Sequence, residues 1–172
     1  LLGRLEEDAD VTDIRPAAYM LATVKHECAD TWAPIIERGT PAYFDKYEPG
    51  TRLGLQLGNR EKGDGLRYKG RGYVQITGRT NYARLGELLG IGDALVKSPL
   101  LALDPGVAYR IMSVGMRRGA FTGRKLKQHP PGLGISRLSE VVPRPELIPG
   151  SVALLGELGY EGISQVEYKR DV

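Results

Sequence analysis

The sequence predicts a single, mostly helical domain with one long glycine-rich region and one short extended segment. Three stretches place apolar residues at helical spacing, and residues that favour helix ends bound them. Residues 38–72, between the first two stretches, are rich in glycine and show little periodicity. The 172 residues are enough to bury a core, and 41% hydrophobic and 26% charged residues are ordinary for a globular protein. We therefore treat residues 1–172 as one domain.

The first expected helix opens at Pro16. Proline is favoured there because backbone N–H groups in the first turn have no hydrogen-bond partner within the helix, so the missing N–H costs nothing. Its apolar stripe consists of Ala17, Met20, Leu21, Val24 and Cys28. Glu27 stands at the edge of this stripe, near the end of the helix. We expect apolar neighbours to shield half of the Glu27 side chain.

Two further helices are expected after the glycine-rich region. One is capped by Thr80 and ends at Gly90, and the next begins at Asp104-Pro105 and ends near Gly119. The buried stripe of the earlier one consists of Tyr82, Leu85, Leu88 and Leu89. After these helices, prolines break up the chain from residue 128 onward and leave one short expected helix around residues 152–158.

The stretch from Gly70 to Tyr82 is the most informative for function. Val74 and Ile76 alternate with polar residues, so an extended segment over 72–77 would place the polar side chains on one face. With the start of the following helix, that face presents Tyr73, Gln75, Thr77 and Asn81. Hydroxyls and amides are both donors and acceptors, and therefore suit a ligand with hydroxyl and acetamido groups. The alternative is a buried strand, turn and helix whose polar side chains only satisfy backbone groups.

These residues resemble a known signature. Gly70-Arg71-Gly72 followed by Gln75, Thr77, Asn81 and Tyr82 is similar to the motif of glycoside hydrolase family 19, the chitinases and phage endolysins. His26-Glu27, placed 48 residues before Gln75, resembles the catalytic pair of that family. The resemblance covers roughly residues 17–125, and residues 43–68 resemble the bacterial and phage branch. It implies a lysozyme-like helical domain with a substrate cleft, in which residues 128–172 are divergent.

The resemblance also implies a reaction, the hydrolysis of β-1,4 bonds in a polymer that contains N-acetylglucosamine. Inversion at the anomeric carbon is expected, with one carboxyl group as acid and another as base. Glu27 is the expected acid, because burial and the negative end of a helix dipole both favour the protonated form. Glu48 follows 21 residues later and is the expected base, while Glu37 follows after ten residues and is the other candidate. Asp45 and Glu61 also remain open.

Six residues are expected to line the substrate site. They are His26, Arg71, Tyr73, Gln75, Thr77 and Asn81. His26 projects about 100° away from Glu27 on an ideal helix, which favours a hydrogen-bonding role over proton transfer. Trp32 is expected to pack against the helix rather than stack on a sugar, and Cys28 to be a buried thiol. We expect no metal or cofactor, because His26 and His129 are far apart in sequence and the single cysteine has no cysteine partner.

The charge of the chain indicates the class of partner. A net charge of +3 and a pI near 9.0 favour an anionic polymer, hence peptidoglycan over chitin and a bacteriolytic endolysin or cell-wall hydrolase over a defence chitinase. We expect a monomer whose partner is this polysaccharide, without nucleic acid and without stable membrane insertion. No signal peptide is visible, so we expect synthesis in the cytoplasm and action on the bacterial cell wall, or secretion if a leader has been removed.

Two other functions remain open. Arginines and tyrosines interleave over residues 67–84, as they would in a basic module that binds single-stranded nucleic acid. A glycan-binding domain with the same fold but without activity is the other alternative. The open choice of second carboxylate keeps this reading available.

Overall fold

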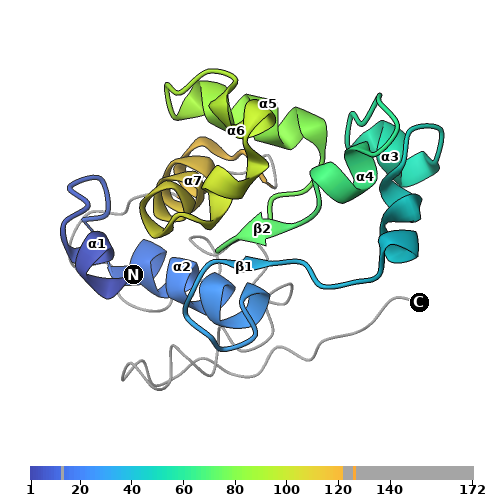
Figure 1. The fold of residues 1–172 in the computed structure, drawn as a ribbon. Coiled ribbons are helices and arrows are strands. Elements are labelled where there is room, and N and C mark those ends of the chain that lie inside the picture. The colour runs from blue at the N-terminus through green and yellow to red at the C-terminus, as the bar shows by residue number, and fades with distance from the viewer. Residues whose placement is uncertain (13, 122–125, 127–172) are drawn as a thin grey trace.

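The computed structural model describes residues 1–12, 14–121 and 126, and it confirms the mainly helical fold (Figure 1). Helices α1, α2, α5, α6 and α7 gather on one side of the molecule, and α3 and α4 lie on the other. The strands β1 and β2 lie between these two groups. We call the first group the large lobe, and we call residues 38–70, which contain α3 and α4, the small lobe.

The large lobe has two hydrophobic clusters. Its elements are α1 (Leu2–Glu6), α2 (Ile14–Glu27), α5 (Arg79–Leu88), α6 (Ala94–Lys97), the 3-10 helix η2 (Pro99–Leu103) and α7 (Pro105–Arg118). One cluster contains Met20 and Val24 of α2 with Met112 of α7. The other contains Tyr82 and Leu85 of α5. Fully burying one such side chain contributes about 1.5–3 kcal/mol, so these clusters hold the lobe together.

Helices α2 and α7 confirm two of the predicted elements. Asp104 caps α7, because its Oδ1 accepts the N–H groups of Gly106 at 2.8 Å and Val107 at 2.9 Å. The same helix ends at Gly119, whose φ of 69° is the left-handed conformation that glycine adopts most easily. Helix α2 begins at Ile14, so Pro16 lies inside the first turn rather than at its first position.

Helix α5 is also confirmed, but two of its details were wrong. The residue before the helix is Gly78 rather than Thr80, which lies exposed within the first turn. The side chain of Asn59 accepts the N–H of Arg79 at 2.9 Å, so a distant residue replaces the local cap. Leu88 is 37% exposed, whereas the other members of the expected stripe are buried.

The small lobe is more regular than its sequence suggests. It contains the 3-10 helix η1 (Pro41–Tyr47), α3 (Arg52–Gln56) and α4 (Asp64–Arg67). The hydroxyls of Thr40 and Thr51 cap η1 and α3. Gly54 packs so closely on the end of η1 that a Cβ there would collide with the carbonyl of Glu48. These helices are too short to produce a visible hydrophobic period.

The extended segment expected over residues 72–77 was wrong. Strand β1 (Ile35–Ile36) pairs antiparallel with β2 (Arg71–Gly72), and the chain then reverses direction at once. Arg71 and Ile76 close this turn through backbone hydrogen bonds of 3.2 and 3.0 Å. Gly72 permits the reversal with a φ of 86°, and a Cβ there would lie 2.9 Å from the carbonyl oxygen of Ala102.

Part of the prediction lies outside the described residues. This applies to the short helix around 152–158 and to the divergent part, 128–172, as a whole. Within the ranges described above, no helix is long and apolar enough to cross a membrane.

Candidate active site

Glu27 is the last residue of α2 and is partly buried. Burial raises the pKa of its carboxyl above the usual value, while the neighbouring His26 opposes that rise. The chain turns sharply after the helix, since Ala29, Asp30 and Trp32 have φ values of 48°, 59° and 55°. Such values are uncommon outside glycine. Trp32, which was expected to pack against the helix, is 40% exposed.

Cys28 joins the end of α2 to the turn that follows β2. Its Sγ lies 3.7 Å from the carbonyl oxygen of Gly72 and 3.6 Å from that of Tyr73, so the thiol can donate weakly to both. The thiol is fully buried, and burial raises its pKa to about 11. As predicted, it is a buried thiol, and its contacts hold the end of α2 against the small sheet.

Glu37 directly follows β1 and is held against the same sheet. Its Oε2 accepts the N–H of Gly70 at 2.8 Å, and its Oε1 accepts the hydroxyl of Tyr47 at 3.2 Å. The Oε1 of Gln75 and the Oε2 of Glu37 lie 2.8 and 3.1 Å from the point that a Cβ on Gly70 would occupy. Glycine at position 70 therefore lets the carboxylate and the amide lie next to each other.

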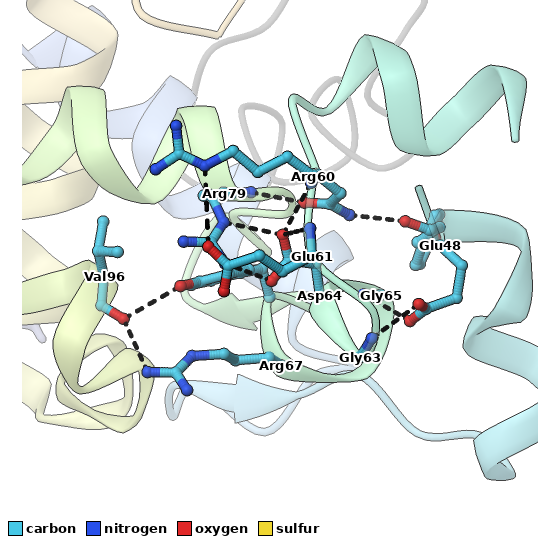
Figure 2. A network of polar contacts seen from close by, with 12 residues as sticks. Glu48, Arg60, Glu61, Gly63, Asp64, Gly65, Arg67, Arg79 and Val96 are labelled. Atoms are coloured by element: carbon cyan, nitrogen blue, oxygen red, sulfur yellow. Dashed lines mark hydrogen bonds and ion pairs between the residues drawn. The ribbon is translucent and has the colours of Figure 1, made fainter. Parts of the chain in front are cut away.

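Glu48 lies in the small lobe and binds the start of α4 (Figure 2). Its Oε2 accepts the N–H of Gly63 at 2.7 Å, and its Oε1 accepts the N–H of Gly65 at 3.0 Å. Both carboxylate oxygens are thus engaged with the backbone. The other acidic candidates, Asp45 and Glu61, are exposed.

Beside Glu48, Asp64 and Arg79 form a buried ion pair (Figure 2). Arg79 donates from Nε at 2.8 Å and from Nη2 at 2.6 Å to the two oxygens of Asp64. Burial alone would raise the pKa of Asp64, but these bonds and the N–H groups of Arg60 and Glu61 lower it below the usual value. The pair fastens the small lobe to the start of α5.

The polar residues of the predicted binding face bind backbone groups. Gln75 donates from Nε2 to the carbonyls of Ile35 at 3.0 Å and Gly72 at 2.9 Å. The hydroxyl of Thr77 donates to the carbonyl of Gln75 at 3.0 Å, and Asn81 donates to the carbonyl of Thr77 at 2.7 Å. All three side chains remain partly exposed. Their contact with a substrate stays a prediction.

Three other predicted contact residues lie in different surroundings. Arg71 is only 6% exposed and donates from Nη1 to the carbonyl of Lys69 and the hydroxyl of Tyr82. Tyr73 is buried in the cluster around α2 and α7. His26 is exposed beside Glu27. Tyr47 was not among the residues predicted from the sequence, because its contact with Glu37 joins residues ten apart that only the fold brings together.

A hollow of about 520 Å³ lies elsewhere, between the N-terminal segment and α7. Its lining includes Asp8, which accepts the hydroxyls of Tyr109 at 2.8 Å and Ser113 at 2.6 Å. These bonds tie the N-terminal segment to α7, and we assign them a structural role. Within the described part of the chain, no cluster of three or more His, Cys, Asp or Glu side chains is arranged to hold a metal ion.

The chain is similar to two plant endochitinases over a short stretch. It is 47% identical over 45 residues to the acidic endochitinase pcht28 of Solanum chilense, and 44% identical over 45 residues to the acidic 26 kDa endochitinase of Solanum lycopersicum. Each match covers 26% of this chain and 18% of the relative, so the chain spans less than a fifth of either relative. No family model and no solved structure matches. The stretch indicates at most a chitinase-like relationship, and the wider resemblance to family 19 stays a prediction.

Proposed function

We propose that this chain hydrolyses β-1,4 glycosidic bonds in a polymer that contains N-acetylglucosamine. One observation carries the proposal: two partly buried acidic residues adjoin the same two-stranded sheet in the chain, since Glu27 directly precedes Cys28, whose thiol lies against β2, and Glu37 directly follows β1. The Glu37 carboxylate accepts the N–H of Gly70 at the start of β2. The short similarity to endochitinases supports the same class of reaction.

Glu27 is the proposed general acid because burial favours its protonated form. It would give its proton to the glycosidic oxygen as the bond from that oxygen to the anomeric carbon breaks. Glu37 would take a proton from a water molecule whose oxygen attacks the opposite face of the carbon. Inversion by this route requires the two carboxyl groups to stand about 6.5–9.5 Å apart, with the water between them.

Glu37 is a better candidate for the base than Glu48, for a structural reason. Glu37 lies next to Gln75, a residue of the predicted binding face. Glu48 binds two backbone N–H groups within the small lobe and thereby holds α4 in place. We therefore propose Glu37 as the base, and Glu48 is the alternative that mutagenesis must exclude.

The distribution of charge favours peptidoglycan as the polymer. The small lobe, residues 38–70, carries seven basic and four acidic residues, so the net charge of +3 resides there. Three of those four acids, Glu48, Glu61 and Asp64, are engaged with backbone N–H groups or with Arg79. Peptidoglycan is anionic and chitin is not, and a basic lobe attracts the anionic polymer. On this basis we propose a bacterial cell-wall hydrolase of the endolysin type that acts as a monomer.

The nucleic-acid alternative has less support, because the arginines on which it depended are engaged within the protein. Arg71 is buried, and Arg79 binds Asp64. Arg67 donates to the carbonyls of Val96 and Lys97, and Arg84 donates to that of Ala120.

The test is digestion of purified peptidoglycan and of chitin oligomers, with mass spectrometry of the products. The wild-type chain, Glu27→Gln, Glu37→Gln and Glu48→Gln are compared, and circular dichroism confirms folding. We expect cleavage by the wild type, loss of cleavage in the first two variants, and cleavage by the third if it folds. Tight glycan binding without any cleavage by the wild type would favour the inactive binding domain.

A further inference from the structure

We propose that Tyr47 is a positioning residue, which holds the Glu37 carboxylate in place for the attack of water. This inference rests on the proposed function and adds to it a residue that does not touch the reacting atoms. The hydroxyl of Tyr47 donates to Oε1 of Glu37 at 3.2 Å, while the N–H of Gly70 donates to Oε2 at 2.8 Å. With one donor on each oxygen, rotation of the carboxylate is restricted.

The hydroxyl can act as a fixed donor because the rest of Tyr47 is anchored. Its backbone carbonyl accepts the Nδ2 of Asn59 at 2.7 Å. Its ring lies 6.4 Å from that of Phe44, centroid to centroid, and the Nζ of Lys46 lies 4.7 Å from its centroid. The tyrosine is therefore held at the backbone and around the ring.

The anchoring extends across the small lobe to α5. The buried side chain of Asn59 bonds to the carbonyl of Tyr47 and also accepts the N–H of Arg79 through Oδ1 at 2.9 Å. Arg79 in turn binds Asp64. This connected set of bonds positions the Tyr47 hydroxyl relative to the large lobe. The hydroxyl in turn holds Oε1 of Glu37, while Gly70 holds Oε2.

Tyr47 remains a donor over the pH range in which a glycosidase works. Burial and the negative charge of Glu37 raise the pKa of the phenol, although Lys46 opposes part of that rise. Other titratable groups nearby are Tyr82 of α5, whose pKa is about 12, and Arg71, which binds the Tyr82 hydroxyl. Tyr82 keeps its proton in that range because burial raises its pKa.

The test variant is Tyr47→Phe, which removes only the hydroxyl. We expect kcat to fall about tenfold while KM stays within about twofold, because the carboxylate activates water rather than binding substrate. The acidic limb of the kcat profile is expected to move to higher pH, because a hydrogen-bond donor that favours the charged carboxylate is lost. A purely structural role would not produce this shift.

Tyr43→Phe is the matched control. Tyr43 belongs to the same helix, is 45% exposed, and also contacts Lys46, whose Nζ lies 3.5 Å from its ring centroid. No contact joins it to Glu37 within the described residues. We expect both kinetic constants and the acidic limb to match those of the wild type.

A second substitution protects the test against misfolding. Fluorotyrosine at position 47 keeps the ring and the hydroxyl but lowers the pKa of the phenol. We expect wild-type activity near neutral pH and an added loss at alkaline pH, where the hydroxyl ionises. Fluorotyrosine at position 43 should show no such loss.

The outcomes separate the two proposals. If the wild type cleaves glycans but Tyr47→Phe keeps kcat within about twofold with an unshifted acidic limb, only the role of Tyr47 is overturned. An equal loss in Tyr43→Phe overturns it as well. If the wild type cleaves no glycan, the proposed function fails, and the inference fails with it.

Discussion

Replacing Glu27 with glutamine keeps the shape of the side chain and removes its proton. General acid catalysis contributes about 10²–10⁴-fold in rate, which corresponds to about 2.7–5.4 kcal/mol of barrier height at 1.36 kcal/mol for each tenfold step. The polar groups on Gln75, Thr77 and Asn81 are untouched, because their hydrogen bonds go to backbone carbonyls and not to Glu27. We therefore expect kcat to collapse while binding of an oligosaccharide is preserved.

The same substitution should increase stability, and the sign follows from the raised pKa of Glu27. Its carboxyl holds a proton more tightly in the folded chain than in the unfolded chain. The folded chain therefore loses stability as the pH rises above 4.5, the ordinary pKa of the group. Glutamine carries no such cost, so Glu27→Gln should gain stability relative to the wild type above that pH and gain nothing below it.

Two measurements check this pair of effects. Product release from peptidoglycan gives kcat, and urea unfolding at several pH values gives the free energy of unfolding. Lost activity with gained stability is the combination expected of a catalytic residue whose environment is tuned for chemistry. A variant that keeps more than about half of wild-type kcat, with unchanged stability, would place the general acid elsewhere.

Three further predictions concern binding and stability. Gln75→Ala should raise KM more than it lowers kcat, as steady-state kinetics would show; an unchanged KM would remove Gln75 from the binding site. Asp64→Asn should cost about 1.5–3 kcal/mol of unfolding free energy near neutral pH, because Arg79 loses the charged acceptor of two hydrogen bonds and keeps only the exposed Glu61 as an ion-pair partner. The cost should shrink as the pH falls below 3.8, since protonation of the wild-type carboxyl, whose pKa is lowered, removes the same interaction. Gly54→Ala should lower the melting temperature because its Cβ collides with the Glu48 carbonyl, whereas Gly3→Ala, with no atom within 4 Å of its Cβ, should not; equal melting of the two variants would contradict the packing argument.

The parts of the fold that could be predicted from sequence are those set by local interactions. The stripe of α2 could be predicted from the spacing of its apolar residues. The ends of α7 could be predicted because Asp104 and Gly119 form hydrogen bonds with residues within one helical turn. The start of α5 was predicted wrongly because the backbone N–H of Arg79 donates to the side chain of Asn59, which lies 20 residues earlier. Residue spacing alone does not reveal such a long-range bond.

In the candidate site, too, features set by local sequence could be predicted and those set by long-range contacts could not. Glu27 was located because an apolar helix carries it, and its partial burial follows from the position of that helix. The alternation through Val74 and Ile76 predicted a strand, but Gly72 reverses the chain before a strand can form. The partners of Glu37 and Glu48 depend on how the small lobe folds back, so the sequence left the choice between these two acids open.

The position of Trp32 provides a built-in probe of this site. It is the only tryptophan in the chain, it lies five residues after Glu27, and two-fifths of its surface is in contact with solvent. Indole emission depends on solvent contact, so a saccharide that approaches the end of α2 would change the intensity or wavelength of a signal with a single source. Titration of the unlabelled Glu27→Gln variant could then follow substrate occupancy by fluorescence while no turnover interferes.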